Sequence, residues 1–136
     1  MIDSDFNLLA GQLTLRAPAE ASVIAQFRID HGVELPEDYV DFLLHSNGAD
    51  GPVGETGYVS LWAIDELSEL NRGYRVEEFA PDLLFFGSDG GDEAFAFDLR
   101  DSSMPIVEVP FIGVSLDEAR PLAATFTEML TSTWAR

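Results

Sequence analysis

Apolar residues recur at helical spacing in two stretches near the beginning of the chain. Residues 18–31 predict a helix with Val23, Ile24 and Phe27 on its inward face, between a proline and a glycine that are typical of a helix start and stop. Residues 36–47 predict a second helix, which opens with another proline and ends at an Asn-Gly pair. The inward residues of this second helix are Tyr39, Phe42 and Leu43.

Glycine and strict alternation dominate the next stretch. Residues 48–57 contain four glycines and one proline, a composition typical of a loop. Residues 58–62 alternate as a strand does, and Trp62 in this strand is expected to be part of the core. Asp65 is a suitable N-cap for a short helix that follows and carries two leucines.

A β-hairpin is predicted over residues 83–99. Its two apolar segments flank a Gly-Asp cluster, which places the turn at residues 88–93. Phe95, Phe97 and Leu99 share one face of the returning strand, and the alternate residues share the other. The hairpin therefore has an acidic tip.

The last third of the chain predicts one strand and one final helix. Residues 106–109 form the strand, and residues 115–118 match the capping box of a single helical turn. Pro121 is incompatible with the interior of a continuous helix, so a separate helix is predicted to start near it. The buried residues of this helix are predicted to be Leu122, Phe126, Met129 and Leu130.

The order of these elements predicts an α+β fold with a mostly antiparallel sheet flanked by N-terminal and C-terminal helices. Hairpins take the place of the alternating βα units that build a parallel sheet. Residues 2–15 fit a short strand or a helix equally well. The length of 136 residues, the apolar share of 46% and the absence of a linker or repeat favour one domain over residues 1–136.

The N-terminal residues carry neither a positively charged segment nor a long apolar run. We therefore expect no signal peptide and no membrane span. The chain has no cysteine, which excludes disulfides and thiol nucleophiles and fits a reducing compartment. These observations favour a cytoplasmic protein.

Charge narrows the possible partners. The chain has 25 acidic residues against 7 basic ones, all of them arginine, for a net charge of -18. Such a chain repels the phosphates of nucleic acids and of anionic lipids, so direct binding to either is disfavoured. A basic protein partner is favoured, and the alternative is that the acidic residues only keep the protein soluble.

The residues that usually carry catalysis or ligand binding do not form known motifs. His31 and His45 each lie in the last turn of a predicted helix, where they interact with the helix dipole, and no third metal ligand stands at helical spacing. A nucleophile elbow is absent, and without lysine no phosphate-binding P-loop exists. The loop that starts at Asp89 fails the EF-hand spacing. We therefore expect no catalytic residues, no metal and no cofactor.

Two acidic groups are the candidate contact sites for a partner. The hairpin tip carries the first group, and the second predicted helix with its following loop carries the other. For any single member, a role as a turn former or helix-dipole partner is the simpler account. The two groups are Asp89, Asp92 and Glu93, and Glu37, Asp38, Asp41, Asp50 and Glu55.

An ordered set of short segments resembles the SUKH superfamily, the Smi/Knr-type domains. The resemblance covers residues 20–132. No single segment is decisive, but their order and spacing are specific. The segments are Leu35-Pro36-Glu37-Asp38-Tyr39, Asn47-Gly48, Tyr58-Val59-Ser60-Leu61-Trp62, Leu70-Asn71, Phe86-Gly87-Ser88-Asp89-Gly90-Gly91, Ala96-Phe97-Asp98, Val109-Pro110 and the helix from Phe126 to Leu130.

The resemblance implies an α+β fold and, for the bacterial branch, an immunity protein that neutralises a cognate toxin, often a nuclease. It carries no catalytic residues, because the family is not defined by any. The net charge of -18 agrees with this role, because an acidic protein can occlude the basic cleft with which a nuclease binds phosphates. Two other functions stay open: a regulatory adaptor of the same fold that binds a cellular protein or peptide, and an enzyme with a carboxylate-based site.

Overall fold

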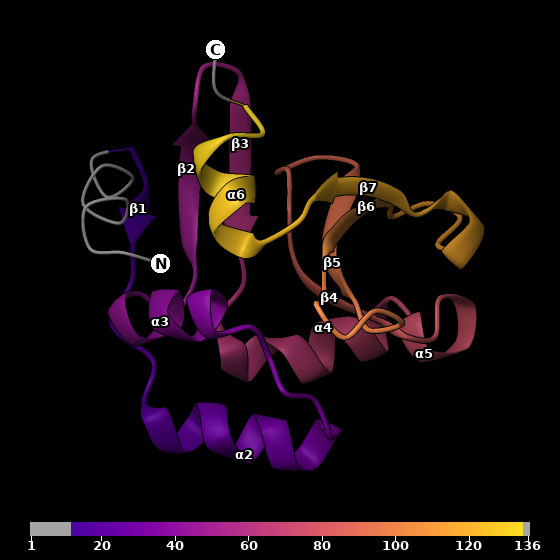
Figure 1. The fold of residues 1–136 in the computed structure, drawn as a ribbon, viewed down its shortest axis with the longest axis horizontal. Coiled ribbons are helices and arrows are strands. Elements are labelled where there is room, and N and C mark those ends of the chain that lie inside the picture. The colour runs from indigo at the N-terminus through magenta and orange to yellow at the C-terminus, as the bar shows by residue number, and fades with distance from the viewer. Residues whose placement is uncertain (1–11, 135–136) are drawn as a thin grey trace.

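One antiparallel sheet organises the protein. The computed structural model describes residues 12–134, and within them seven strands follow one another in sequence order, each paired with the next (Figure 1). The strands are β1 (Thr14–Leu15), β2 (Ala49–Val53), β3 (Gly57–Leu61), β4 (Leu83–Ser88), β5 (Glu93–Asp98), β6 (Ile106–Pro110) and β7 (Arg120–Ala123). The predicted α+β class with a mostly antiparallel sheet is confirmed.

Five α-helices and two short 3-10 turns complete the described part of the chain. They are α2 (Ala21–His31), α3 (Glu37–His45), the turn η1 (Ile64–Glu66), α4 (Leu67–Gly73), α5 (Val76–Phe79), the turn η2 (Leu116–Glu118) and α6 (Phe126–Thr131). The first predicted helix starts three residues late, at Ala21, and ends as expected at Gly32 with a left-handed φ of 61°. Ile24 and Phe27 are buried, whereas Val23 is 39% exposed and does not belong to the inward face.

The prediction of a loop over residues 48–57 is wrong, because half of it is strand β2, paired with β3, and Gly57 is the first residue of β3. The glycines of this stretch permit close packing instead of a free loop. A Cβ atom on Gly51 would lie 2.8 Å from the carbonyl oxygen of Gln12, and one on Gly57 would lie 2.4 Å from the ring of Trp134. Glycine is therefore required in this hairpin because other chain segments press against its backbone.

The predicted helix start near Pro121 is also wrong. Pro121 lies in β7 opposite Val107, at the edge of the sheet, where a missing N–H is tolerated. The final helix begins at Phe126, and the Thr125 hydroxyl accepts a hydrogen bond of 3.0 Å from the N–H of Glu128. Phe126, Met129 and Leu130 are buried as predicted; Leu122 lies on β7 instead.

The sequence predicts that Asp65 caps the short helix, and this prediction is wrong. Asp65 lies within η1, and the N-terminal N–H of Ile64 donates instead to the side-chain oxygen of Asn47 at 2.8 Å. The nitrogen of the same Asn47 side chain donates to Asp65 at 2.9 Å. The end of α3 and the start of η1 are thus joined by one amide.

The hairpin predicted over residues 83–99 is confirmed. Strands β4 and β5 pair antiparallel, with one register shift between Phe85 and Gly87. Phe95 and Phe97 face the larger core, and Ala94 and Ala96 face the smaller one. The alternation in the sequence therefore assigned the faces correctly.

The sheet has a core on each side. The larger core lies between one face and helices α2, α3 and α6, and its centre is aromatic: the ring of Phe97 lies 4.3 Å from that of Phe86 and 4.9 Å from that of Tyr39. The smaller core lies under α5 and the segment 111–119, where Val76, Ala80 and Phe85 pack on β5 and β6. Helices thus cover one face more completely than the other.

Candidate partner-binding surface

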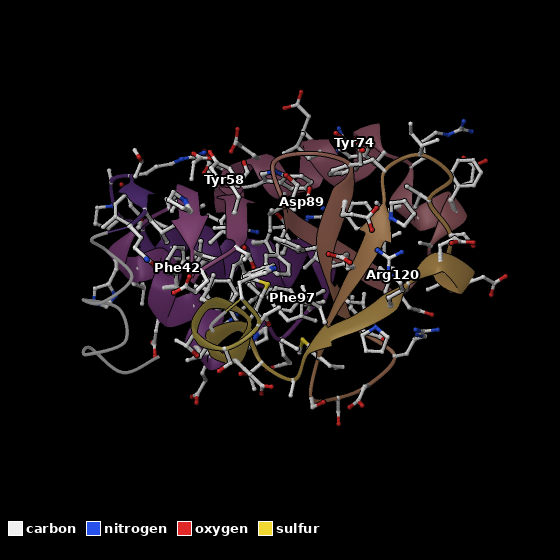
Figure 2. The ribbon with its side chains drawn as sticks, turned by 90° about the horizontal axis from the view of Figure 1, so that it is seen from above. Phe42, Tyr58, Tyr74, Asp89, Phe97 and Arg120 are labelled. Carbon is white, nitrogen blue, oxygen red and sulfur yellow. The ribbon has the colours of Figure 1, made fainter. Side chains whose placement is uncertain are left out.

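Three aromatic side chains pack together on the less covered side of the sheet, and a fourth, Tyr58, lies against the hairpin loop at Gly90. We call Tyr58, Trp62, Tyr74 and Phe111 the aromatic surface. The ring centroid of Tyr74 lies 4.6 Å from that of Phe111 and 6.3 Å from that of Trp62, with the latter pair nearly parallel. Tyr58 is 46% exposed and Tyr74 is 38% exposed, while the other two rings are half-buried. Figure 2 shows Tyr58 and Tyr74 along the margin opposite α6.

Strand alternation and backbone contacts fix these rings. Tyr58 and Trp62 are four positions apart along β3 and its extension, so they point to the same face. The N–H of Trp62 donates to the carbonyl of Phe86 at 3.0 Å, and the N–H of Phe111 donates to the carbonyl of Asp92 at 2.9 Å. The rings therefore stand on backbone that is held by its neighbours.

Gly90 accommodates the ring of Tyr58. Its φ is 82°, and a Cβ atom there would lie 2.8 Å from the Tyr58 ring. The glycine in the hairpin loop thus allows the loop to lie directly against this aromatic side chain. The loop between β4 and β5 and the aromatic surface form one continuous region.

Three of the acidic residues predicted as contact sites belong to this region. Asp50 accepts a hydrogen bond of 2.8 Å from the hydroxyl of Ser60, which stands between the two aromatic positions of β3, and forms an ion pair of 3.1 Å with Arg16. Asp89 accepts bonds from the N–H groups of Gly91 and Glu93 and so shapes the turn. Asp92 is exposed in the same turn.

The acidic residues of α3 lie on the other side of the sheet. Glu37 and Asp41 are exposed there. Asp38 has a structural contact: one of its oxygens accepts from the N–H and the hydroxyl of Thr127 in α6, at 2.8 and 2.9 Å. The structure therefore separates this group from the hairpin tip.

Glu93 and Glu55 each occupy a further position. Glu93 forms an ion pair with Arg120 on β7, and Arg120 also contacts Glu108 at 2.8 Å. The hydrogen bonds that Arg120 donates to these carboxylates, Glu108 first, raise the pKa of its guanidinium above the ordinary value. Glu55 is exposed in the turn between β2 and β3, and its N–H donates to the carbonyl of Trp134 at 2.8 Å.

A separate groove of about 590 Å³ lies between α2, α4 and α5. His31 and Ser68 form a hydrogen bond of 2.6 Å in its wall. Arg75 lines it but is held by an ion pair to Glu78 at 2.6 Å and lies 5.1 Å from the ring of Phe79. Across residues 12–134, no three His, Asp or Glu side chains come together as a metal site would require.

The aromatic surface is not apparent from the sequence pattern. The pattern predicts Trp62 in the core, and the structure places it half-buried, in contact with both cores. The available signal was the run Tyr58-Val59-Ser60-Leu61-Trp62, in which two aromatic residues and a serine alternate with Val59 and Leu61. The aliphatic side chains of Val59 and Leu61 are buried in the larger core, which leaves the rings of Tyr58 and Trp62 on the other face of the strand.

These features define an α+β domain whose candidate site is a surface of exposed rings and carboxylates. The model of the SMI1 / KNR4 family (SUKH-1) matches residues 18–132, and the chain belongs to this family. No protein of curated function matches it. None of the helices described in residues 12–134 is long and apolar enough to cross a bilayer.

Proposed function

We propose that the protein is a non-catalytic binding domain, an immunity protein that neutralises a cognate bacterial toxin by occlusion. The observation that carries the proposal is the combination of SMI1 / KNR4 family membership over residues 18–132 with a net charge of -18. The family supports a protein partner, and the charge favours a basic one. Toxins that cleave nucleic acids fit this requirement, since they grip phosphates with basic clefts.

Occlusion needs no chemistry from the bound protein. An acidic surface that covers a basic cleft excludes the substrate in two ways: it blocks the cleft sterically, and it neutralises the positive charges that would bind the substrate. Opposite charges also accelerate the encounter, up to about 10⁸–10⁹ M⁻¹s⁻¹ at low ionic strength. Rapid association matters when a toxin is already inside the cell.

The test is protection from a toxin, and the first candidate is any toxin domain that a gene adjacent to this one encodes, called the neighbouring toxin below. Co-expression of the chain should restore growth, and the purified chain should inhibit the purified toxin at an equimolar ratio. An unrelated protein of similar size and net charge is the matched control. Inhibition by both proteins, or by neither, contradicts the proposal. Stable binding to a cellular regulatory protein without protection supports the adaptor function instead.

A further inference from the structure

Two rings of the aromatic surface, those of Tyr58 and Tyr74, are exposed to solvent, and this exposure adds little to the stability of the domain. Tyr74 packs against Trp62, Phe85 and Phe111, yet keeps 38% of its surface in contact with solvent. Tyr58 keeps 46% exposed beside the hairpin loop. Tyr and Trp that are held rigid and half-exposed are the residues that most often dominate binding energy at protein interfaces.

The chain segments that adjoin these rings in sequence are rich in acidic residues. Between Trp62 and Tyr74 the chain carries three carboxylates and one arginine, and between Phe111 and Ala119 it carries two carboxylates and no basic residue. The loop between β4 and β5 adds two more, one of which forms the turn that lies against Tyr58. These carboxylates are Glu69, Asp89, Asp92, Asp117 and Glu118, together with Asp65, which is hydrogen-bonded by Asn47, and Glu66, which forms an ion pair with Arg16.

We infer that the aromatic surface is the docking site for a basic protein surface, with arginine side chains of the partner lying over the rings of Trp62, Tyr74 and Tyr58. A guanidinium over an aromatic face is attracted by the ring electrons, and neighbouring carboxylates increase that attraction. The inference rests on the proposed function only for the identity of the partner. The recognition chemistry follows from the rings and the charge.

Charge complementarity selects this occupant over the alternatives. A second copy of the chain brings another net charge of -18 and another acidic border to the same surface. Nucleic acid and anionic lipid are repelled for the same reason. A basic protein is the class of partner whose charge matches the border and whose side chains stack on the rings.

A short peptide of alternating arginine and alanine is the probe for the surface itself. Titration into the ¹⁵N-labelled protein should shift the Trp62 indole and the backbone amides of Tyr58, Tyr74 and Phe111. The Trp134→Phe variant assigns the two indole signals. An equally long peptide of glutamate and alanine should shift none of them.

Two substitutions measure the contribution of the rings. Tyr74→Ser and Tyr58→Thr should each lower the affinity of the protein for the arginine peptide by about tenfold. Ile29→Ser is the matched control, since Ile29 is 74% exposed on α2 and lies outside the aromatic surface. The amide spectrum of each variant reports whether it is folded, and the wild-type shift map decides the location without any variant.

Shifts that spread over α3 as strongly as over the aromatic surface overturn the inference, as does unchanged affinity in folded Tyr74→Ser. Self-association that Tyr74→Ser abolishes overturns it in favour of a second copy. If the arginine peptide maps to the rings while the neighbouring toxin does not bind at all, the docking chemistry stands and the immunity function fails. The two proposals can therefore fail separately.

Discussion

The side-chain amide of Asn71 in α4 bridges the backbone of Phe85 in β4: its nitrogen donates to the Phe85 carbonyl at 2.9 Å, and its oxygen accepts from the Phe85 N–H at 2.9 Å. Strand β3 pairs with β4 only opposite Gly87 and Ser88. Beyond that point the chain turns away into η1 and α4. The amide thus supplies the two backbone hydrogen bonds to Phe85 that a neighbouring strand would otherwise make.

Replacing Asn71 with leucine removes both of these bonds and also the bond that its nitrogen donates to the carbonyl of Leu67. The N–H and the carbonyl of the buried Phe85 are left without these partners. We expect the free energy of unfolding to fall by about 2–4 kcal/mol, measured by urea denaturation. Gln26→Leu is the matched control, because its amide bonds only to Asp30 on an exposed helix surface. A loss in Asn71→Leu no larger than in the control would show that the bridge contributes little. The folded variant should also bind a partner more weakly, since Tyr74 follows the last residue of α4, three positions after Asn71.

Local periodicity explains what the sequence predicted well. The hairpin of β4 and β5, the buried face of α3 and the end of α2 at Gly32 follow from alternation, helical spacing and glycine, all of which act over a few residues. Long-range contacts explain what it missed. The glycines of the β2–β3 hairpin indicate a loop, but Gln12 presses on Gly51 in β2 and Trp134 presses on Gly57 in β3. Pro121 indicates a helix start, but it lies on an edge strand.

The candidate site follows the same division. Carboxylates can be found in a sequence, but whether one is free for a partner depends on contacts made far along the chain. Asp38 meets Thr127 across 89 positions, and Glu93 meets Arg120 across 27. The four rings of the aromatic surface come from three separate segments, so no local pattern marks them as one surface.

Phe97 tests the larger core. Its side chain is fully buried and packs against Phe86 and Tyr39. Phe97→Ala should lower the free energy of unfolding by about 3–5 kcal/mol, because it removes the buried ring and leaves a cavity. Ile29→Ala, on the exposed side of α2, should change it by less than about 0.5 kcal/mol. A change below about 1 kcal/mol for Phe97→Ala contradicts this view of the core.

The hydroxyl of Tyr39 is buried and has no hydrogen-bond partner among the described residues. Removing it should therefore not destabilise the protein, and Tyr39→Phe should unfold at an equal or higher urea concentration. A loss of more than about 1 kcal/mol would show that the hydroxyl has a partner. Tyr58→Phe, at an exposed ring, controls for the substitution itself.

Burial also raises the pKa of the Tyr39 hydroxyl well above its ordinary value. In the unfolded chain the Tyr39 hydroxyl loses its proton near pH 10, whereas in the folded chain it keeps the proton at that pH. Rising pH therefore favours unfolding from about pH 10 upward. Relative to Tyr39→Phe, the free energy of unfolding of the wild type should fall by up to about 1.4 kcal/mol per pH unit above pH 10. Denaturation of both proteins between pH 8 and about pH 11 checks the sign, and parallel curves contradict it.

The contact between Asp38 and Thr127 holds α6 against α3. Asp38→Asn exchanges an acceptor oxygen for a donor, and Thr127→Val removes the hydroxyl. We expect each to cost about 1–2 kcal/mol, with a coupling of at least about 0.5 kcal/mol in the double variant. Glu37→Gln, the adjacent exposed carboxylate, should have little effect. Strict additivity would mean that the two side chains stabilise the protein independently.

The last prediction concerns which acidic group steers a partner. Because Asp38 is structural, the helix group is tested with Glu37→Gln and Asp41→Asn, and the hairpin group with Asp89→Asn and Asp92→Asn, so that each set removes two charges. Asparagine at 89 keeps the oxygen that shapes the turn. Since the hairpin loop lies against the aromatic surface, its set should lower the association rate with the neighbouring toxin by about 2–5-fold at low salt and flatten the salt dependence. The helix set should have the smaller effect. Equal effects in stopped-flow measurements would assign steering to net charge alone, and a larger effect of the helix set would place the contact on α3.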